Sequence, residues 1–260
     1  IEAERREQAP EVMVVVRDAE GAVVRRVPGP AKQGVHRVSW DLRYPAMEAI
    51  GTPPSWFTPE PTGFLAMPGR YSATLEQKVD GVVSTLAGPV EVVVEQMRSG
   101  SLPARPLAET GAYIKRLNDL GRGISAANLK LPALALRVEQ LGQALARAQD
   151  RGAVDRRYEA ARQQLFVLTE AFSGNASKAA IGEPDTHRLG NRYWHAMLGV
   201  QFSSYGPTPS HLRSLEIAEA EYAQWSAEVN QFEGQTLPAL EQALVAAGAP
   251  SVPGAALPQR

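Results

Sequence analysis

The spacing of apolar residues changes once along the chain, and this change constrains the fold more than any other feature. Up to about residue 97, apolar and polar residues alternate in short runs bounded by Gly, Pro and Asp, which is typical of β-strands. Beyond residue 107 apolar residues recur every three or four positions, which is typical of amphipathic helices. Residues 98–106 hold a glycine and two prolines between the two patterns. We therefore predict an α+β protein with two segregated domains.

The predicted domains follow from this change. Residues 1–97 are expected to form an immunoglobulin-like or fibronectin-like β-sandwich, with 1–10 as a lead-in, because about six or seven short strands alternate with turns every ~8–12 residues. Residues 98–106 are expected to be a linker, 107–248 an antiparallel helical bundle, and the proline-rich 249–260 an extended tail.

Two hairpins and a central strand define the predicted sandwich. The β-branched runs 11–17 and 22–27 flank the turn sequence Asp-Ala-Glu-Gly at 18–21, and Asp80-Gly81 turns the chain between two later runs. Alternation over 34–43 predicts a further strand, with Trp40 as the core aromatic of the sandwich. The last strands are expected at 70–78, 82–86 and 89–95.

Local signals predict where the helices begin and end. Pro132 is expected to break the first helical stretch, and 150–152 to turn the chain between antiparallel helices. Asp185 is a predicted N-cap for a helix that reaches about Gln201. The last helix is expected to start at Thr208 and Pro209, to bend or break at Gly234 and Pro238, and to end at Gly248.

A proline-rich excursion crosses the sandwich between residues 45 and 67. Five prolines forbid a regular strand or helix there, and loops of this length are usually functional or packed on a neighbour. Trp56 and Phe57 would anchor it. Together with Arg43 and Tyr44 they are our candidate interface or ligand platform, while packing on their own domain is the alternative.

Composition excludes several function classes. With 27 Lys and Arg against 28 Asp and Glu, a net charge of −1 argues against nucleic-acid binding. The absence of cysteine removes disulfides, thiolate chemistry and Cys-based zinc sites. No apolar run approaches the ~20 residues of a membrane span. Starting at Ile1, after which comes a charged lead-in, the sequence is expected to be a piece of a longer protein.

No catalytic constellation is visible in the sequence. His187 and His195 are about two helical turns apart, too far to bind one ion unaided, and no nucleophile elbow or phosphate-binding loop occurs. We predict no catalytic, cofactor-binding or metal-binding residues. The dense group at 193–195 is expected to be core packing, with a ligand pocket at that helix seam as the alternative.

Five segments carry a resemblance to a known family: 18–25 (DAEGAVVR), 34–45 (GVHRVSWDLRYP), 68–71 (PGRY), 207–209 (PTP) and 248–254 (GAPSVPG). They resemble the C-terminal region of bacterial proteins with a sortilin-like, BNR-repeat β-propeller, which often carry the label glycosyl hydrolase. The resemblance implies a sandwich and a bundle attached to a propeller in a secreted or periplasmic protein. The Asp-box repeats of the propeller are absent here, so any hydrolytic centre would lie outside these residues.

These observations favour a non-catalytic accessory region. The sandwich would pack on or extend the protein's own propeller, and the bundle would dock or form homo-oligomers. A carbohydrate- or peptide-binding module built on Trp56, Phe57, Arg43 and Tyr44 is the second hypothesis. A third is that the chain completes a glycosidase-like site in the intact protein.

Overall fold

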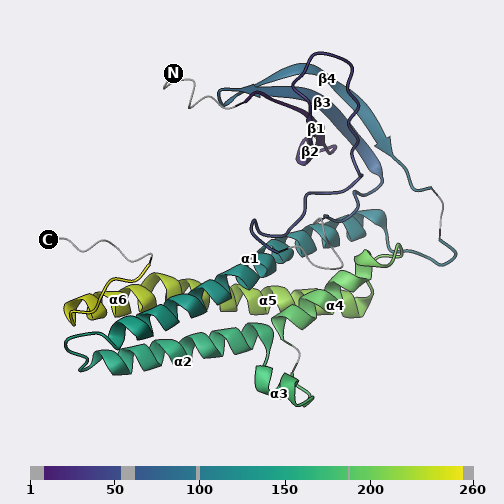
Figure 1. The fold of residues 1–260 in the computed structure, drawn as a ribbon. Coiled ribbons are helices and arrows are strands. Elements are labelled where there is room, and N and C mark those ends of the chain that lie inside the picture. The colour runs from purple at the N-terminus through teal and green to yellow at the C-terminus, as the bar shows by residue number, and fades with distance from the viewer. Residues whose placement is uncertain (1–8, 54–61, 98–99, 187, 254–260) are drawn as a thin grey trace, which may run out of the picture. The chain divides into compact units, whose positions relative to one another are not determined.

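The structure of the chain is a computed structural model that describes residues 9–53, 62–97, 100–186 and 188–253 (Figure 1). It contains two compact units. The sheet unit comprises Ile1–Met47, Pro53–Ile114 and Ser204–Gly206, and the helical unit comprises Glu48–Thr52, Lys115–Ser203 and Pro207–Arg260. The predicted α+β class, with strands preceding helices, is confirmed.

The sheet unit is built on four antiparallel strands in the order β2-β1-β3-β4. Their bounds are β1 Glu11–Arg17, β2 Val23–Gly29, β3 Gly69–Val79 and β4 Val82–Val94. The turn before β2 forms as predicted, because the Ala22 amide donates to Asp18 Oδ1 at 2.7 Å and Gly21 adopts φ 81°. The β3–β4 turn has positive φ at both Asp80 and Gly81, as the hairpin chemistry requires.

The predicted immunoglobulin-like or fibronectin-like sandwich is wrong, because the described strands form one open sheet. Residues 34–43 do not form a strand, and their part of the chain makes a single bridge between Arg43 and Leu65. Leu42 has φ 57°, which breaks the extended run, and the Trp40 indole donates to the carbonyl of Arg43 at 3.0 Å. The segment therefore folds on itself where the alternation predicted a ladder.

Trp40 nevertheless reaches the core of the sheet unit. Its ring lies edge-on to that of Tyr71 with centroids 5.3 Å apart. This core is made of Val16, Val24, Ala66 and Tyr71, with Trp40, Tyr44, Val92 and Val94 packed against it. The two strands predicted at 82–86 and 89–95 are the single strand β4, which passes the irregular position Gly88 at φ 97°.

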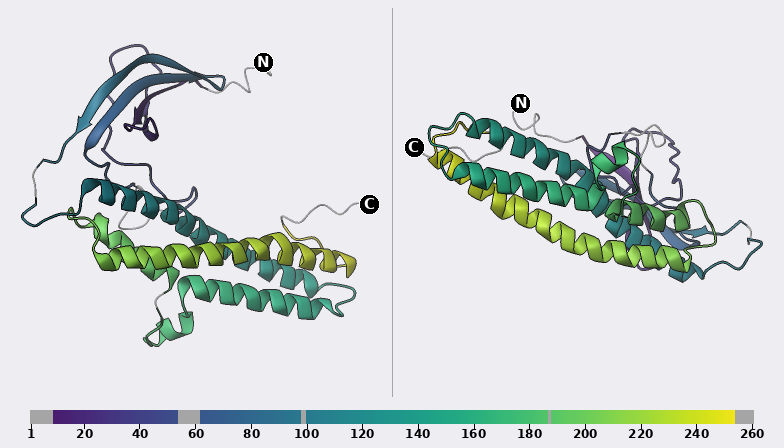
Figure 2. Two further views of the ribbon diagram at one scale, coloured as in Figure 1. Left: turned by 180° about the vertical axis from the view of Figure 1, so that it is seen from behind. Right: turned by 90° about the horizontal axis from the view of Figure 1, so that it is seen from below.

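The helical chain gives six α-helices and one π-helical turn within the described residues: α1 Leu107–Leu145, α2 Val154–Ser173, α3 Ala176–Ala180, α4 Leu189–Gln201, α5 Pro209–Gln231, η2 Phe232–Thr236 and α6 Leu237–Ala246. The elements α5, η2 and α6 are continuous, and we call them the α5–α6 rod. With the rod counted as one helix, the helices form a five-helix bundle. From Lys115 onward α1 belongs to the helical unit. The helices α1, α2 and the rod lie side by side along much of their length (Figure 2).

Three ion pairs show that α1 and the rod are parallel: Arg116–Glu219, Lys130–Glu233 and Arg137–Glu241. Between the first and second pairs both helices advance by 14 residues (130 − 116 and 233 − 219). Between the second and third pairs α1 advances by 7 residues (137 − 130) and the rod by 8 (241 − 233). The extra residue falls in the wide turn η2, which therefore keeps the rod in register with α1.

The helix boundaries are partly as predicted. Thr208 caps α5 with Pro209 at its first position, and the interruption expected at Gly234 and Pro238 is η2. The expected break at Pro132 is wrong: α1 continues through it, because Leu131 and Leu134 on either side are buried in the bundle. Arg188 rather than Asp185 precedes α4, since Asp185 instead bonds the amides of Asn175 and Thr186.

Candidate functional site

The candidate platform is only partly visible in the structure. Trp56 and Phe57 lie outside the described residues. Arg43 and Tyr44 lie in the sheet unit, where they hold the chain around residue 44 against the segment at 62–67. Arg43 Nη1 donates to the carbonyl of Gly63 at 2.9 Å, and the Tyr44 amide donates to the carbonyl of Phe64 at 2.9 Å.

The phenol of Tyr44 faces the core of the sheet unit. The Tyr71 hydroxyl donates to the carbonyl of Met67 at 2.6 Å, and the ring of Tyr44 packs against the same core. Burial raises the pKa of Tyr71 to about 12 and raises that of Tyr44 as well. Polar groups of Arg43 and Tyr44 are therefore used within the unit, and the ligand platform stays a prediction.

The aromatic group at 193–195 divides between core and surface. Tyr193 is buried as predicted, whereas Trp194 and His195 are exposed on α4. The His195 ring lies 4.8 Å from the ring of His211 at the start of α5. Partial burial and the neighbouring His195 lower the pKa of His211, which favours its neutral form.

Two features of the described residues concern metal binding and membrane spanning. None of their His, Asp and Glu side chains gather in a group of three that could hold a metal ion. Within the same residues, no helix combines the length and the apolar character needed to cross a bilayer. His187 lies outside them.

Strand β4 is the most apolar exposed element of the sheet unit. It has 13 residues and forms one edge of the sheet, pairing with β3 alone among the described strands. Its only charged residue, Glu91, is in an ion pair with Arg70 of β3 at 3.1 Å. Five of its large apolar side chains are exposed: Val82 69%, Val83 55%, Leu86 48%, Val90 63% and Val93 53%.

The sequence of β4 departs from the simple alternation of apolar and polar residues that is typical of a strand with one buried face. Apolar residues occupy neighbouring positions at 82–83 and 92–94, so they point to both faces of the sheet. Strands with continuous apolar runs are typically covered on both faces. An edge strand of this length and composition is also a template for pairing with another chain.

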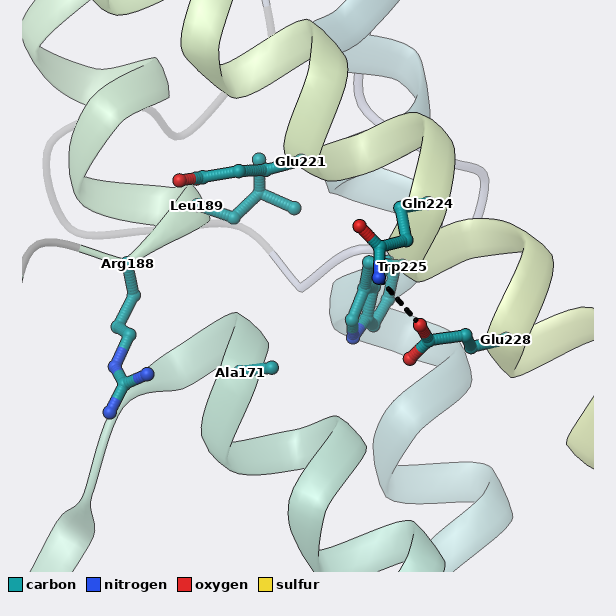
Figure 3. Close-up of a pocket in the computed structure, with 7 residues that line it drawn as sticks. All are labelled: Ala171, Arg188, Leu189, Glu221, Gln224, Trp225 and Glu228. Carbon is teal, nitrogen blue, oxygen red and sulfur yellow. Dashed lines mark hydrogen bonds between the residues drawn. The ribbon is translucent and has the colours of Figure 1, made fainter.

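A small pocket lies in the helical unit where α2 ends and α4 begins (Figure 3). It has a volume of about 250 Å³ and is lined by Ala171, Arg188, Leu189, Glu221, Gln224, Trp225 and Glu228. Leu189 and Trp225 are buried, and the Trp225 indole donates to the carbonyl of Leu168 at 2.9 Å. With its N–H used by α2, the indole offers the pocket only its apolar ring.

Charged groups line opposite sides of this pocket. In the view of Figure 3, Arg188 lies on one side and Glu228 on the other, with Ala171 and Trp225 between them. Glu221 is in an ion pair with Arg192 at 3.1 Å. Glu228 accepts a hydrogen bond from Gln224 at 3.0 Å and has no cationic partner among the described residues.

Arg188 is only partly satisfied. One Nη contacts Asp185 at 3.4 Å, while its buried Nε has no hydrogen-bond partner among the described residues. Asp185 is shared with the amides of Asn175 and Thr186, and these bonds, followed by the charge of Arg188, lower its pKa to about 2. The pocket thus combines a guanidinium whose Nε lacks a partner among the described residues, an apolar floor and the solvent-exposed carboxylate of Glu228. The sequence analysis did not predict this pocket, and Glu228 itself is exposed.

Comparison of the chain with protein-family models, with curated proteins and with solved structures finds no match in any of the three. The resemblance to propeller-bearing proteins therefore stays a prediction.

Proposed function

We propose that the chain is a non-catalytic accessory region of a larger secreted or periplasmic β-propeller protein, and that its sheet docks on another domain of that protein. The observation that supports this role is the exposed apolar edge strand β4. The propeller and the export come from the sequence resemblance alone.

The occupant that fits β4 best is an extended strand. An edge strand presents unpaired backbone N–H and C=O groups, and only another strand can satisfy a row of them in register. The exposed Val and Leu side chains would then pack beside apolar residues of the incoming strand, which removes them from water. Edge strands that must stay free usually carry unpaired charges, above all Lys, and β4 has no Lys.

Docking through the sheet is favoured over docking through the bundle by the distribution of apolar surface. On α2 the exposed apolar residues Phe166 and Val167 are adjacent, but the apolar residues on either side of them, Leu165 and Leu168, are buried. Strand β4 instead carries five such residues along one continuous element. Exposed apolar groups that are contiguous mark interaction surfaces, whereas scattered ones are ordinary.

Hydrogen exchange in two proteins tests the proposal. One is this 260-residue chain, and the other is the complete polypeptide encoded by the open reading frame that contains it. We expect the amides of 82–94 to exchange about tenfold or more slowly in the complete polypeptide, because a paired strand must open before it exchanges. The amides of α2, at 154–173, serve as the control and should exchange equally in both.

Three outcomes contradict the proposal. Equal exchange of 82–94 in both proteins would show that nothing covers β4. Protection that already appears in the 260-residue chain and depends on protein concentration would assign the edge to a second copy. A reading frame that encodes no domain besides these two units would remove the larger protein altogether.

A further inference from the structure

The first turn of α5 is closed by a capping box in which a histidine stands where an acid or amide is usual. In a capping box, the side chain three residues after an N-cap Ser or Thr accepts a hydrogen bond from the N-cap amide, and that residue is typically Glu or Gln. Here the N-cap is Thr208 and the third helical residue is His211. The box belongs to the helical unit, so it is separate from the docking proposed for β4.

Both hydrogen bonds of this box are formed. The Thr208 amide donates to Nδ1 of His211 at 3.2 Å, and the His211 amide donates to Oγ1 of Thr208 at 3.4 Å. Because a backbone amide can only donate, Nδ1 is unprotonated and the neutral ring carries its hydrogen on Nε2. A second proton turns Nδ1 into a donor, so a charged His211 cannot complete the box.

Helix α4 packs closely against the same nitrogen. A Cβ built at Gly199 of α4 would lie 2.6 Å from Nδ1 and 2.9 Å from Cγ of His211, and Gly199 is buried. Only glycine permits so close an approach. A proton on Nδ1 would thus face the Thr208 amide and the backbone of α4 instead of bulk water. Burying a charge without an acceptor is unfavourable, so the site favours the neutral ring.

The charges around His211 act in the same direction. Its ring lies 4.8 Å from that of His195 on α4, which also becomes cationic in acid. The loop that joins the two helices, 202–208, holds no charged residue. A cation in the first turn of α5 is also opposed by the helix dipole, whose positive end lies there. The other charged residue of α4 and those of α5 up to residue 221 are in ion pairs: Arg192–Glu221, Arg213–Glu216 and Arg116–Glu219.

These surroundings make the closed turn sensitive to acid. Burial first, and then the charge of His195, lower the pKa of His211 below its ordinary value of 6.5. An opened turn therefore binds the proton more tightly than the closed turn does, and acid favours opening. The stabilisation by the box is fully present above pH 6.5 and is lost as the pH falls through the pKa of the folded state.

We propose that His211 is a pH-sensitive switch: in mild acid its protonated ring releases the Thr208 amide, and the first turn of α5 opens away from α4. Helices α4 and α5 lie side by side (Figure 1), and one turn further along the Ser214 hydroxyl donates to the carbonyl of Arg192. Neither group of that bond titrates in mild acid. We therefore expect the opening to be limited to the loop 202–208 and the first turn of α5.

Two measurements on the 260-residue chain test the switch. Long-range 1H–15N spectra of the imidazole rings identify the protonated nitrogen of His211, and we expect hydrogen on Nε2 alone at pH ~7.5. Hydrogen exchange of the Thr208, His211 and Leu212 amides, corrected for the intrinsic effect of pH, measures opening of the turn in which they are bonded. Their protection should fall about tenfold between pH ~7.5 and ~5, because one proton taken up on opening changes the opening equilibrium by up to about tenfold per pH unit.

His211→Gln separates the hydrogen bond from the proton. Gln supplies the same acceptor as the imidazole and does not titrate, so protection at pH ~5 should stay within about twofold of its value at pH ~7.5. His211→Glu is a second capping-box variant that should also keep the turn closed at pH ~5, because a carboxyl stays charged down to an ordinary pKa of ~4.3. Agreement between two different acceptors assigns the effect to the histidine proton and not to altered packing.

His36→Gln is the matched control, because it removes a histidine of the sheet unit that has no part in the box. It should keep the parent's fall in protection. The proposal is overturned if Nδ1 of His211 carries hydrogen at neutral pH, or if the parent's protection is equal at both pH values. It is also overturned if both His211 variants keep the pH dependence of the parent, or if His36→Gln removes it.

Discussion

The two units differ in how completely their apolar residues are buried. In the helical unit the seams of α1, α2 and the α5–α6 rod close on one another, and Leu117, Leu215 and Phe232 are inaccessible to solvent. In the sheet unit one cluster forms on the strands, while β4 leaves five large apolar side chains exposed. Helices satisfy their backbone internally, so a bundle can close with its own side chains. An open sheet leaves an edge strand that needs a partner.

The largest effect is expected from the centre of the bundle. Phe232→Ala should lower the free energy of unfolding by about 3–5 kcal/mol, because it leaves a cavity at the wide turn where the rod faces its neighbours. Urea unfolding followed by helical circular dichroism measures the change. Phe166→Ala on α2 is the control, since Phe166 is 57% exposed, and it should change stability by about 0.5 kcal/mol or less. If both substitutions lowered the free energy of unfolding equally, Phe166 would be covered in solution and the surface of α2 would not be exposed.

The next effect tests how tightly the bundle is packed. A side chain at Gly123 of α1 would collide with the hydroxyl of Tyr222 on α5, so Gly123→Ala should destabilise the unit by about 1–3 kcal/mol. Gly234→Ala is the matched control, because a Cβ there meets nothing within 4 Å. It should be neutral or should stabilise by up to about 1 kcal/mol through helix propensity. If Gly123→Ala is also neutral, the Tyr222 side chain can move aside at no cost, and α1 and α5 are not tightly packed at this point.

Turn and cap chemistry made some parts of this fold predictable from sequence. Asp80-Gly81 and Thr208-Pro209 each specify a local backbone conformation with residues that favour it, and the structure has those conformations. Residues 34–43 were predicted as a strand and do not form one. Their conformation could not be predicted from the sequence, because the positive φ of Leu42 is unusual for a Leu residue and depends on contacts with distant segments. The number of sheets depends on the same distant contacts.

The pocket was beyond local reasoning for another reason. Arg188 precedes α4 and Glu228 lies on α5, and no spacing rule relates them before the bundle assembles. Leu189 and Trp225 are apolar residues that the sequence pattern assigns to the core, and both are buried. That they also line a pocket depends on how the elements around them pack. The platform at Trp56 and Phe57 was predictable as a hypothesis, but these residues lie outside the described chain.

Acid should weaken the helical unit through Asp185. The pKa of this carboxyl is about 2 in the fold against an ordinary value of 3.8, so the folded state holds its proton less tightly than the unfolded state does. The stabilisation is fully present above pH 3.8 and is lost as the pH falls towards 2. Asp185→Asn should therefore make stability less dependent on pH in this range, measured by urea unfolding at several pH values. Glu183→Gln, an exposed change nearby, should keep the slope of the parent.

The smallest effect is expected at the exposed edge, and it tests the contrast between the units most directly. Val→Thr exchanges a methyl for a hydroxyl of similar size, so its effect depends on whether water reaches the site. Val24 is buried in the core of the sheet unit, where Val24→Thr should lower the free energy of unfolding by about 1–3 kcal/mol, since the hydroxyl loses its water. Val90→Thr on β4 should change it by about 0.5 kcal/mol or less, because Val90 is 63% exposed.

This pair of variants also separates the fold from the docking proposal. In the 260-residue chain the two substitutions should differ, and chemical denaturation monitored by hydrogen exchange of β1 and β3 measures that difference. In the complete polypeptide Val90→Thr should become more costly and approach Val24→Thr, because a docked strand would exclude water from Val90. A large loss at Val90 in the 260-residue chain itself would mean that β4 is already covered there, and the contrast between a closed bundle and an open sheet would fail.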